Sequence, residues 1–271
     1  MSSTASREQA GGVTGPARAR IDARTLRTDR WWLQPAVTFV VFSGFVVFAT
    51  YRAFAGDNFY SEPYMSPFFS PCIAHACEGS TSLPVIADWW RLSPALIILI
   101  FPLGFRLTCY YYRKAYYRSF WLSPPACAVA EPHTSYSGET RLPLILNNIH
   151  RYSWYGAMVV AAFLTFETVL AFGPAEGESA GVHMGLGSLL FVVNSVLIWM
   201  YTLSCHSCRH ITGGRLRHFS KHPIRYRLWT WVSRENTRHA LWAWLSLFSV
   251  ALVDLYVYLL ANGTITDPRF F

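Results

Sequence analysis

Soft metal ligands crowd into one short segment of this 271-residue chain. The segment TLSCHSCRHITGGRLRHFSKHP, residues 202–223, holds two cysteines and four histidines. Thiolates and imidazoles are ligands that suit zinc, and cysteine thiolates also hold iron–sulfur clusters. Cys205 and Cys208 have the C-x-x-C spacing, which on a helix places both sulfurs on one face. The pattern predicts a metal or redox centre that surrounding elements must complete.

Further donors lie elsewhere in the chain, in SPPACAVAEP, NNIHRYSWYG and NTRHALWAW. Two cysteines with two histidines suit either tetrahedral zinc or a Rieske-type [2Fe–2S] cluster, and ligand number does not separate them. Haem b held between His150 and His239 is a further alternative. The six predicted metal ligands are Cys127, Cys205, Cys208, His150, His210 and His239.

The elements that carry these donors are predicted to be membrane helices. The chain is 52% hydrophobic and only 14% charged, whereas soluble domains carry about 25% charged residues. A helix needs roughly 20 apolar residues to cross a bilayer. Five segments meet that length, so the expected fold is an all-α integral membrane bundle of five helices, near 36–54, 94–112, 155–172, 185–204 and 240–260.

Charge alternates strictly along the segments that connect these helices. The N-terminal tail has six Arg, residues 113–154 have five basic residues, and residues 205–239 have eight. The other two connections, 56–90 and 173–184, have acids and no Lys or Arg. The positive-inside rule therefore predicts a cytoplasmic N-terminus and an outer C-terminus. The net charge of +8 is then explained by topology and does not indicate nucleic-acid binding.

This topology sorts the candidate ligands by side, with four of six Cys and seven of nine His on the inner side. The outer pair, Cys72 and Cys77, is expected to form a disulfide because the exported side is oxidising, with a metal site including His75 as the alternative. Residues 1–28 are predicted to be a disordered basic tail, and residues 29–271 a single transmembrane domain.

Polar residues within or beside the spans are candidates for function. Glu167 and Asp254 are costly inside a membrane, so each is expected either to pair with polar groups or to serve an outward proton path. Arg106 is near an inner helix end, where its side chain can reach the interface. Hydroxyl, aromatic and cationic groups at the inner ends are candidates for holding quinone: Trp121, Arg151, Tyr152, Ser153 and Arg209.

The order YYYRKAYYRSFWLSPPACAVAEP, GETRLPLILNNIHRYSWYG and LSCHSCRHITGGRLRHFSKHP resembles the single-chain, five-helix membrane anchor of actinobacterial-type succinate dehydrogenase. The resemblance runs from about residue 31 to residue 260. It implies a bacterial plasma-membrane subunit with a flavoprotein and an iron–sulfur subunit as partners, passing electrons to membrane quinone, and a higher oligomer is compatible with it.

The chain departs from the anchors that carry two haems, because its first two predicted spans contain no His. The surplus of inner thiols therefore favours a Rieske-like [2Fe–2S] cluster over haem b. Succinate oxidation itself is expected in a partner subunit, since no nucleotide-binding fingerprint is present. Two other functions remain open at this point, a purely structural anchor and a small membrane transporter.

Overall fold

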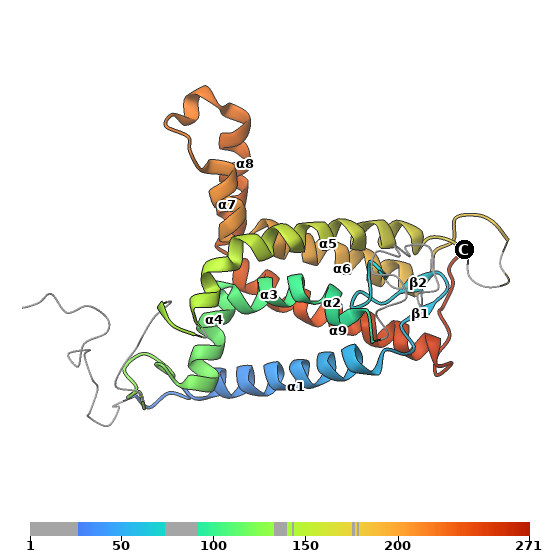
Figure 1. Ribbon diagram of the computed structural model, residues 1–271, viewed down its shortest axis with the longest axis horizontal. Coiled ribbons are helices and arrows are strands. Elements are labelled where there is room, and N and C mark those ends of the chain that lie inside the picture. The colour runs from blue at the N-terminus through green and yellow to red at the C-terminus, as the bar shows by residue number, and fades with distance from the viewer. Residues whose placement is uncertain (1–26, 74–91, 133–139, 143, 175–176, 178) are drawn as a thin grey trace, which may run out of the picture. The chain divides into compact units, whose positions relative to one another are not determined.

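The computed structural model describes residues 27–73, 92–132, 140–142, 144–174, 177 and 179–271 (Figure 1). The chain divides into two compact units. The first comprises Met1–Gly44 and Leu107–Ile149, and the second comprises Phe45–Arg106 and His150–Phe271. All but the last two residues of the predicted disordered tail lie outside the described part. Arg27, one of those two, donates a hydrogen bond to Asp29 and another to the Cys127 carbonyl oxygen, at 2.7 and 2.8 Å.

Four long apolar helices agree with four of the predicted spans. Each is long and apolar enough to cross a membrane, and the second of the four is counted together with the 3-10 turn that precedes it. The boundaries differ from the predicted ones by a few residues. The helices are α1 (Leu33–Ala55), α5 (His150–Leu170), α6 (Leu186–Leu203) and α9 (His239–Ala261), with the 3-10 turn η4 (Leu144–Ile149) before α5.

The predicted second span is not one continuous helix. Pro102 lacks the N–H that would bond to the Ile98 carbonyl, and the helix is interrupted near that point. A second interruption lies at Cys109, whose backbone is extended. The two halves of this segment are bent by 72°, so the described residues provide four spans, or five if the bent pair crosses as one. The pieces are α2 (Ala95–Ile98), α3 (Ile100–Thr108), α4 (Tyr110–Tyr116) and the π-helix η2 (Tyr117–Trp121).

Short elements connect the spans. Strands β1 (Tyr60–Ser61) and β2 (Tyr64–Met65) form an antiparallel pair after α1. Between α6 and α9 the chain forms a helical hairpin that projects sideways from the end of the α5–α6–α9 bundle (Figure 1). The hairpin consists of α7 (His206–Gly213), the 3-10 turn η5 (Phe219–Lys221) and α8 (Pro223–Asn236).

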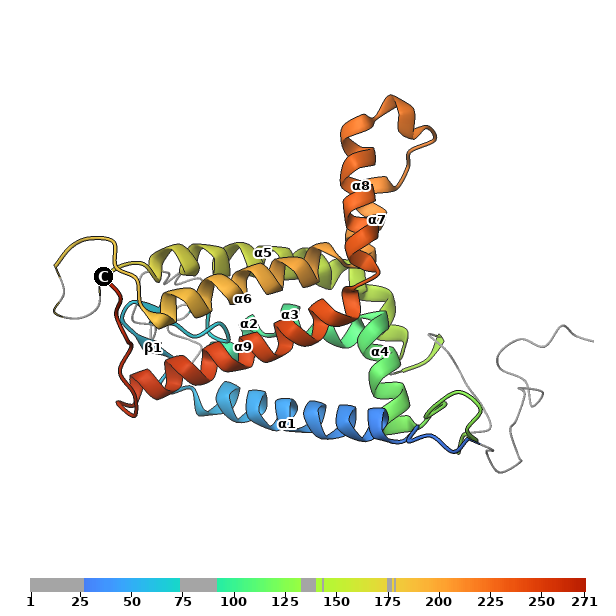
Figure 2. The same ribbon diagram turned by 180° about the vertical axis from the view of Figure 1, so that it is seen from behind.

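Helix α6 packs against both α5 and α9, as Figure 2 shows. The indole N–H of Trp154 in α5 donates to the Thr202 carbonyl oxygen of α6 at 2.9 Å. On the other side, the Ser249 hydroxyl of α9 donates to Asn194 Oδ1 at 3.0 Å. Buried polar groups need such partners in an apolar environment. Asn194, a polar residue in a predicted span, therefore joins two helices.

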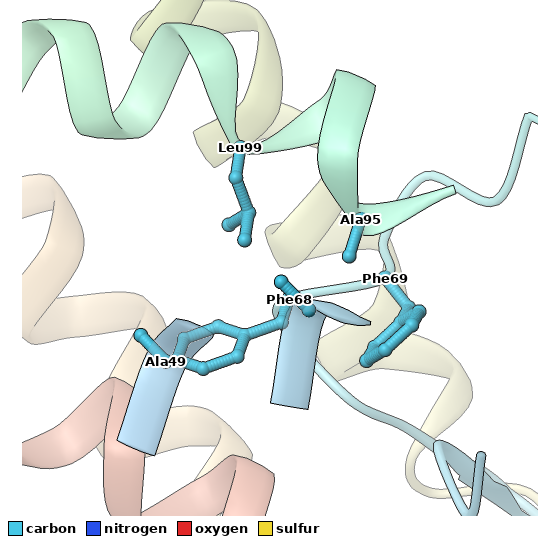
Figure 3. Packing of buried hydrophobic residues seen from close by; sticks show 6 residues of the cluster. Ala49, Phe68, Phe69, Ala95 and Leu99 are labelled. Carbon is cyan, nitrogen blue, oxygen red and sulfur yellow. The ribbon is translucent and has the colours of Figure 1, made fainter. Parts of the chain in front are cut away.

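The end of the bundle opposite the hairpin has a compact apolar core. Ala49 from α1, Phe68 and Phe69 from the following loop, and Ala95 and Leu99 beside α2 are all buried (Figure 3). The Phe69 ring stacks on Phe59 at a centroid distance of 4.6 Å. This core anchors the loop that follows α1 against the helices.

Buried charges at that same end are paired. Arg52 Nε donates to Asp254 Oδ2 at 2.8 Å, and the Ser66 hydroxyl donates to the same carboxylate. Glu167 accepts a hydrogen bond from the Ser70 hydroxyl at 3.1 Å. The expectation that these acids pair with polar groups is therefore confirmed.

The predicted outer loop contains one oxidised cysteine within the described residues. Cys72 is disulfide-bonded, whereas Cys109, Cys127, Cys205 and Cys208 are free thiols. Its predicted partner, Cys77, and the alternative metal ligand His75 lie outside the described part. The oxidation state agrees with an exported location for this loop.

Candidate functional site

The Cys205 thiol and the His150 imidazole meet where α6 ends and α5 begins. His150 Nε2 lies 3.2 Å from Cys205 Sγ, and both side chains are buried. Helices α5 and α6 are neighbours that run in opposite directions (Figure 1), so the start of one lies beside the end of the other. We call this end of the bundle the basic end, because the basic segment 205–239 adjoins it.

Cys205 is also the residue that turns the chain out of α6. Its backbone is extended, and its Sγ accepts a hydrogen bond from the Ser207 N–H at 3.4 Å as the N-cap of α7. Cys208, in the first turn of α7, is buried as well. Burial raises the pKa of the Cys208 thiol and favours its protonated form.

Four rings form a continuous series across the basic end. His150 stacks on Phe105, Phe105 contacts Tyr201, and Tyr201 stacks on His239. Each step has a centroid distance of 5.0 Å. The two imidazoles predicted as haem ligands therefore stand at opposite ends of a series with two aromatic rings between them.

Hydrogen bonds orient the His239 imidazole. Its Nδ1 lies 2.7 Å from the Ser204 hydroxyl oxygen, and that hydroxyl donates to the Tyr201 carbonyl oxygen at 3.1 Å. Because a serine hydroxyl has one proton, these two contacts favour the His239 tautomer that carries its proton on Nδ1. Histidines that bind metals are commonly oriented in this way by their other nitrogen.

Arg106 lies beside this ring series, with its guanidinium carbon 4.7 Å from the Tyr201 ring centroid. It donates to the Ser246 hydroxyl at 3.0 Å and to the Ala243 carbonyl oxygen at 3.3 Å. The sequence predicted a side chain that reaches for the interface. Instead, Arg106 turns into the bundle and connects α3 to α9.

An apolar cavity of about 70 Å³ adjoins the ring series. Its walls include Phe105, Arg106 and Tyr201 and are otherwise mostly aliphatic. It is smaller than sites that enclose whole drug-sized ligands, which are roughly 300–1,000 Å³. A quinone ring entering here must therefore displace some lining side chains.

The other predicted metal ligands are more dispersed. His210 is exposed on α7, where its ring centroid lies 4.3 Å from that of His206. Cys127 is exposed and belongs to the first unit. Within the described residues, no three His, Cys, Asp or Glu side chains lie close enough together to hold a metal ion.

These donors do not fit a complete metal centre as they stand. A Rieske cluster or a structural zinc ion needs four ligands. Among the described residues the predicted ligands Cys205 and His150 are in contact, but no group of three metal-binding side chains is present. Haem b between His150 and His239 fits no better, because Phe105 and Tyr201 lie between the two imidazoles.

The predicted quinone-binding residues differ in burial and in the contacts they make. Arg151 and Tyr152 are exposed, whereas Ser153 is buried. Arg209 is held in the hairpin, where it donates to the Ser233 hydroxyl at 3.0 Å. Trp121, in the first unit, stacks with Tyr117 and is half exposed.

The exposed surface beside α7 is cationic. The pKa of His206 is lowered by partial burial and by the positive charges of His210, Arg209 and Arg151. Neutral His206 is therefore favoured at this surface.

Sequence reasoning missed two site residues, Phe105 and Tyr201, and misjudged Arg106. Aromatic residues are frequent in membrane helices, so nothing in their types distinguished them. Arg106 did carry a signal, because a charge inside a predicted span commonly marks a polar interior.

The chain is similar to known proteins over nearly its full length. Residues 33–263 match the family model described as actinobacterial succinate dehydrogenase subunit SdhC. Among solved structures, a chain of the Mycobacterium smegmatis Sdh1 complex in the apo form is 52% identical, with a TM-score of 0.83. That match covers 97% of this chain and 100% of the other.

Among curated proteins, the comparison found no match. The family match covers most of the chain, and the structural match agrees with it in fold and sequence. The expectation drawn from the resemblance is confirmed: this chain belongs to the actinobacterial SdhC family, the membrane subunits of succinate dehydrogenase.

Proposed function

We propose that this chain anchors succinate dehydrogenase to the bacterial plasma membrane and delivers its electrons to quinone at the basic end. The observation that carries the proposal is the buried Cys205–His150 contact beside the ring series and the apolar cavity. A flavoprotein and an iron–sulfur subunit dock on the cytoplasmic face. The similarity to a chain of the Sdh1 complex supports these partners.

The cavity residues suit the reduction of a lipophilic acceptor. Its aliphatic walls favour an apolar ring and exclude water, while Arg106 supplies a cation next to them. Quinone reduction places negative charge on carbonyl oxygens, and a preorganised cation stabilises such charge strongly in an apolar site. The hydrogen bonds from Arg106 to α9 hold the guanidinium in place.

A redox centre at the Cys205–His150 pair is the finer part of this proposal, with a Rieske-like [2Fe–2S] cluster preferred over haem b. The buried Cys–His contact and the oriented His239 imidazole support it. Cys208 and His239 would complete the ligand set only after side chains at the basic end rearrange, because Phe105 and Tyr201 lie between His150 and His239. When bound, such a cluster would supply single-electron transfer at a higher potential than an all-cysteine cluster.

Replacing the cysteine of this pair tests the proposal. In Cys205→Ser, we expect quinone reduction by succinate to fall by at least the roughly 10–100-fold that loss of a metal-site contact costs. Succinate oxidation with a soluble artificial acceptor should persist, because it needs only the partner subunits. In the reduced variant complex, the paramagnetic resonance signal of a His-ligated [2Fe–2S] cluster, which has a low average g value, should be absent. Elemental analysis should show less iron than in the wild-type complex.

Cys109→Ser is the matched control, since Cys109 is buried but is not among the proposed ligands. It should retain both activities and the signal. Normal quinone reduction by assembled Cys205→Ser complex would overturn the proposal. A Soret band in the wild-type complex, with no cluster signal, would show that the redox centre is haem b and not an iron–sulfur cluster.

A purely structural anchor is the second candidate. The observation that favours it is that no group of three metal-binding side chains occurs within the described residues. In that case Cys205→Ser would alter assembly or thermal stability without a selective loss of quinone reduction.

A further inference from the structure

The helical hairpin between α6 and α9, residues 206–236, is rich in basic residues and is held together by contacts between α7 and α8. We call it the arm. Gly213 lies so close to α8 that an added Cβ would be 2.4 Å from Trp229 Cδ1. Arg225 from α8 donates to the carbonyl oxygens of Thr212 and Gly214, both at 3.0 Å, and so closes the end of α7. Phe219 packs on Trp229 at a centroid distance of 5.0 Å. These contacts hold α7 and α8 together as one arm.

The arm runs across the direction of α5, α6 and α9 (Figures 1 and 2). Because those helices cross the bilayer along their own axes, an arm that leaves their ends crosswise lies along the membrane plane. If the basic end is cytoplasmic, as the positive-inside rule predicts, the arm lies at the level of the inner headgroups.

The face of α8 that points away from α7 mixes cations with exposed apolar side chains. Helical spacing places Arg227, Trp231 and Arg234 on this face. Ile224 and Leu228 flank them and are 73% and 50% exposed. Amphipathic interfacial helices combine these residue types, because apolar groups enter the acyl boundary while guanidinium groups reach phosphates.

The charge of the arm is almost unopposed. Residues 205–239 contain eight Lys or Arg and one acid, Glu235. That carboxylate is buried and lies 3.4 Å from Arg234 Nε. The inner leaflet carries negative surface charge, which attracts basic segments by about 1 kcal/mol for each Lys or Arg near it.

We propose that α8 lies on the cytoplasmic leaflet and that its outward face binds anionic phospholipid headgroups. Arg227 and Arg234 contact the phosphates, while Ile224 and Leu228 enter the boundary between headgroups and acyl chains. The alternative occupant of this face is a soluble partner subunit. The crosswise direction of the arm and its exposed aliphatic residues favour the lipid surface.

A photo-crosslinking amino acid in place of Leu228 identifies what covers this face. The assembled complex is placed in nanodiscs of phosphatidylcholine alone or of phosphatidylcholine with phosphatidylglycerol, irradiated, and the adducts are identified by mass spectrometry. We expect phospholipid adducts, enriched in phosphatidylglycerol. That enrichment should fall about fivefold for each neutralised Arg, in Arg227→Gln and then in Arg227→Gln with Arg234→Gln.

Two controls separate the arm from general effects of charge. Lys114→Gln with Arg141→Gln removes two exposed basic residues outside the arm, and should leave the enrichment unchanged. The same crosslinker in place of Val232, which is buried, should form adducts only within the chain. Adducts of Leu228 to a partner subunit, phospholipid adducts without preference for the anionic lipid, or no adducts would each overturn the proposal.

Discussion

At the scale of single residues, Arg52 and Asp254 form the most deeply buried charge pair among the described residues. Arg52 is 1% exposed and Asp254 is fully buried. Besides the carboxylate, the guanidinium donates to the Asp57 and Asn58 carbonyl oxygens and lies over the Tyr258 ring at 4.5 Å. A charge pair with this many partners serves to join α1 to α9. It offers no support for the transporter considered from the sequence.

Removing one charge of this pair should destabilise the protein strongly. In Asp254→Asn, Arg52 loses its buried counter-charge and keeps only the exposed Asp57 carboxylate, 3.4 Å from Nη1, so the free energy of unfolding should fall by about 3–5 kcal/mol. Thermal unfolding of the purified complex measures the change.

The double variant Arg52→Met with Asp254→Leu is the control, because replacing both charges with apolar residues commonly restores stability. If Asp254→Asn is as stable as the wild type, the pair is not the buried, mutually dependent contact described above.

At the scale of elements, close approach of α3 and α5 positions the site. Gly156 in α5 faces Phe101 in α3, and an added Cβ would lie 2.2 Å from Phe101 Cδ1. Phe105, one turn further along α3, belongs to the ring series. The lack of a side chain at position 156 thus lets α3 bring Phe105 and Arg106 to the basic end.

Gly156→Ala tests this packing. Alanine is favoured over glycine in helices by up to about 1 kcal/mol, but the clash with Phe101 should reverse the sign and cost about 1–3 kcal/mol. Thermal unfolding should therefore show a loss of stability, and quinone reduction should fall with it.

The matched control is Gly44→Ala in α1, where an added Cβ has nothing within 4 Å. It should be neutral or slightly stabilising. Equal stabilisation by both substitutions would contradict the close packing of α3 against α5.

At the scale of the whole molecule, the loop charges and the oxidation state of Cys72 both agree with the predicted topology. Basic segments alternate with acidic ones along the chain, and oxidised Cys72 lies on the side predicted to be exported. The bent pair of helices between residues 95 and 121 decides whether the number of spans is odd. Five spans place the two termini on opposite sides, whereas four place them on the same side.

Reporter fusions test this arrangement. With alkaline phosphatase, which is active only after export, we expect an active enzyme at the C-terminus and an inactive one at the N-terminus. A fluorescent protein that matures in the cytoplasm should show the opposite pattern. Both termini on one side would mean that the bent pair enters and leaves the membrane on the same face.

By itself, the sequence determined the membrane class, the positions of four spans and the family. Hydropathy and loop charge are local properties, so a short window suffices to detect them. The sequence also indicated Cys205, His150 and His239 as candidate ligands. The hypothesis that four of the six Cys and His candidates bind one metal centre stays a prediction.

Only the tertiary structure decided which of these side chains meet. The Cys205–His150 contact joins residues 55 positions apart, and the Arg52–Asp254 pair spans 202 positions. Such contacts depend on the rotation and packing of whole helices, which hydropathy does not encode. The break at Cys109, the inward turn of Arg106 and the sideways direction of the arm likewise follow from backbone geometry and three-dimensional packing.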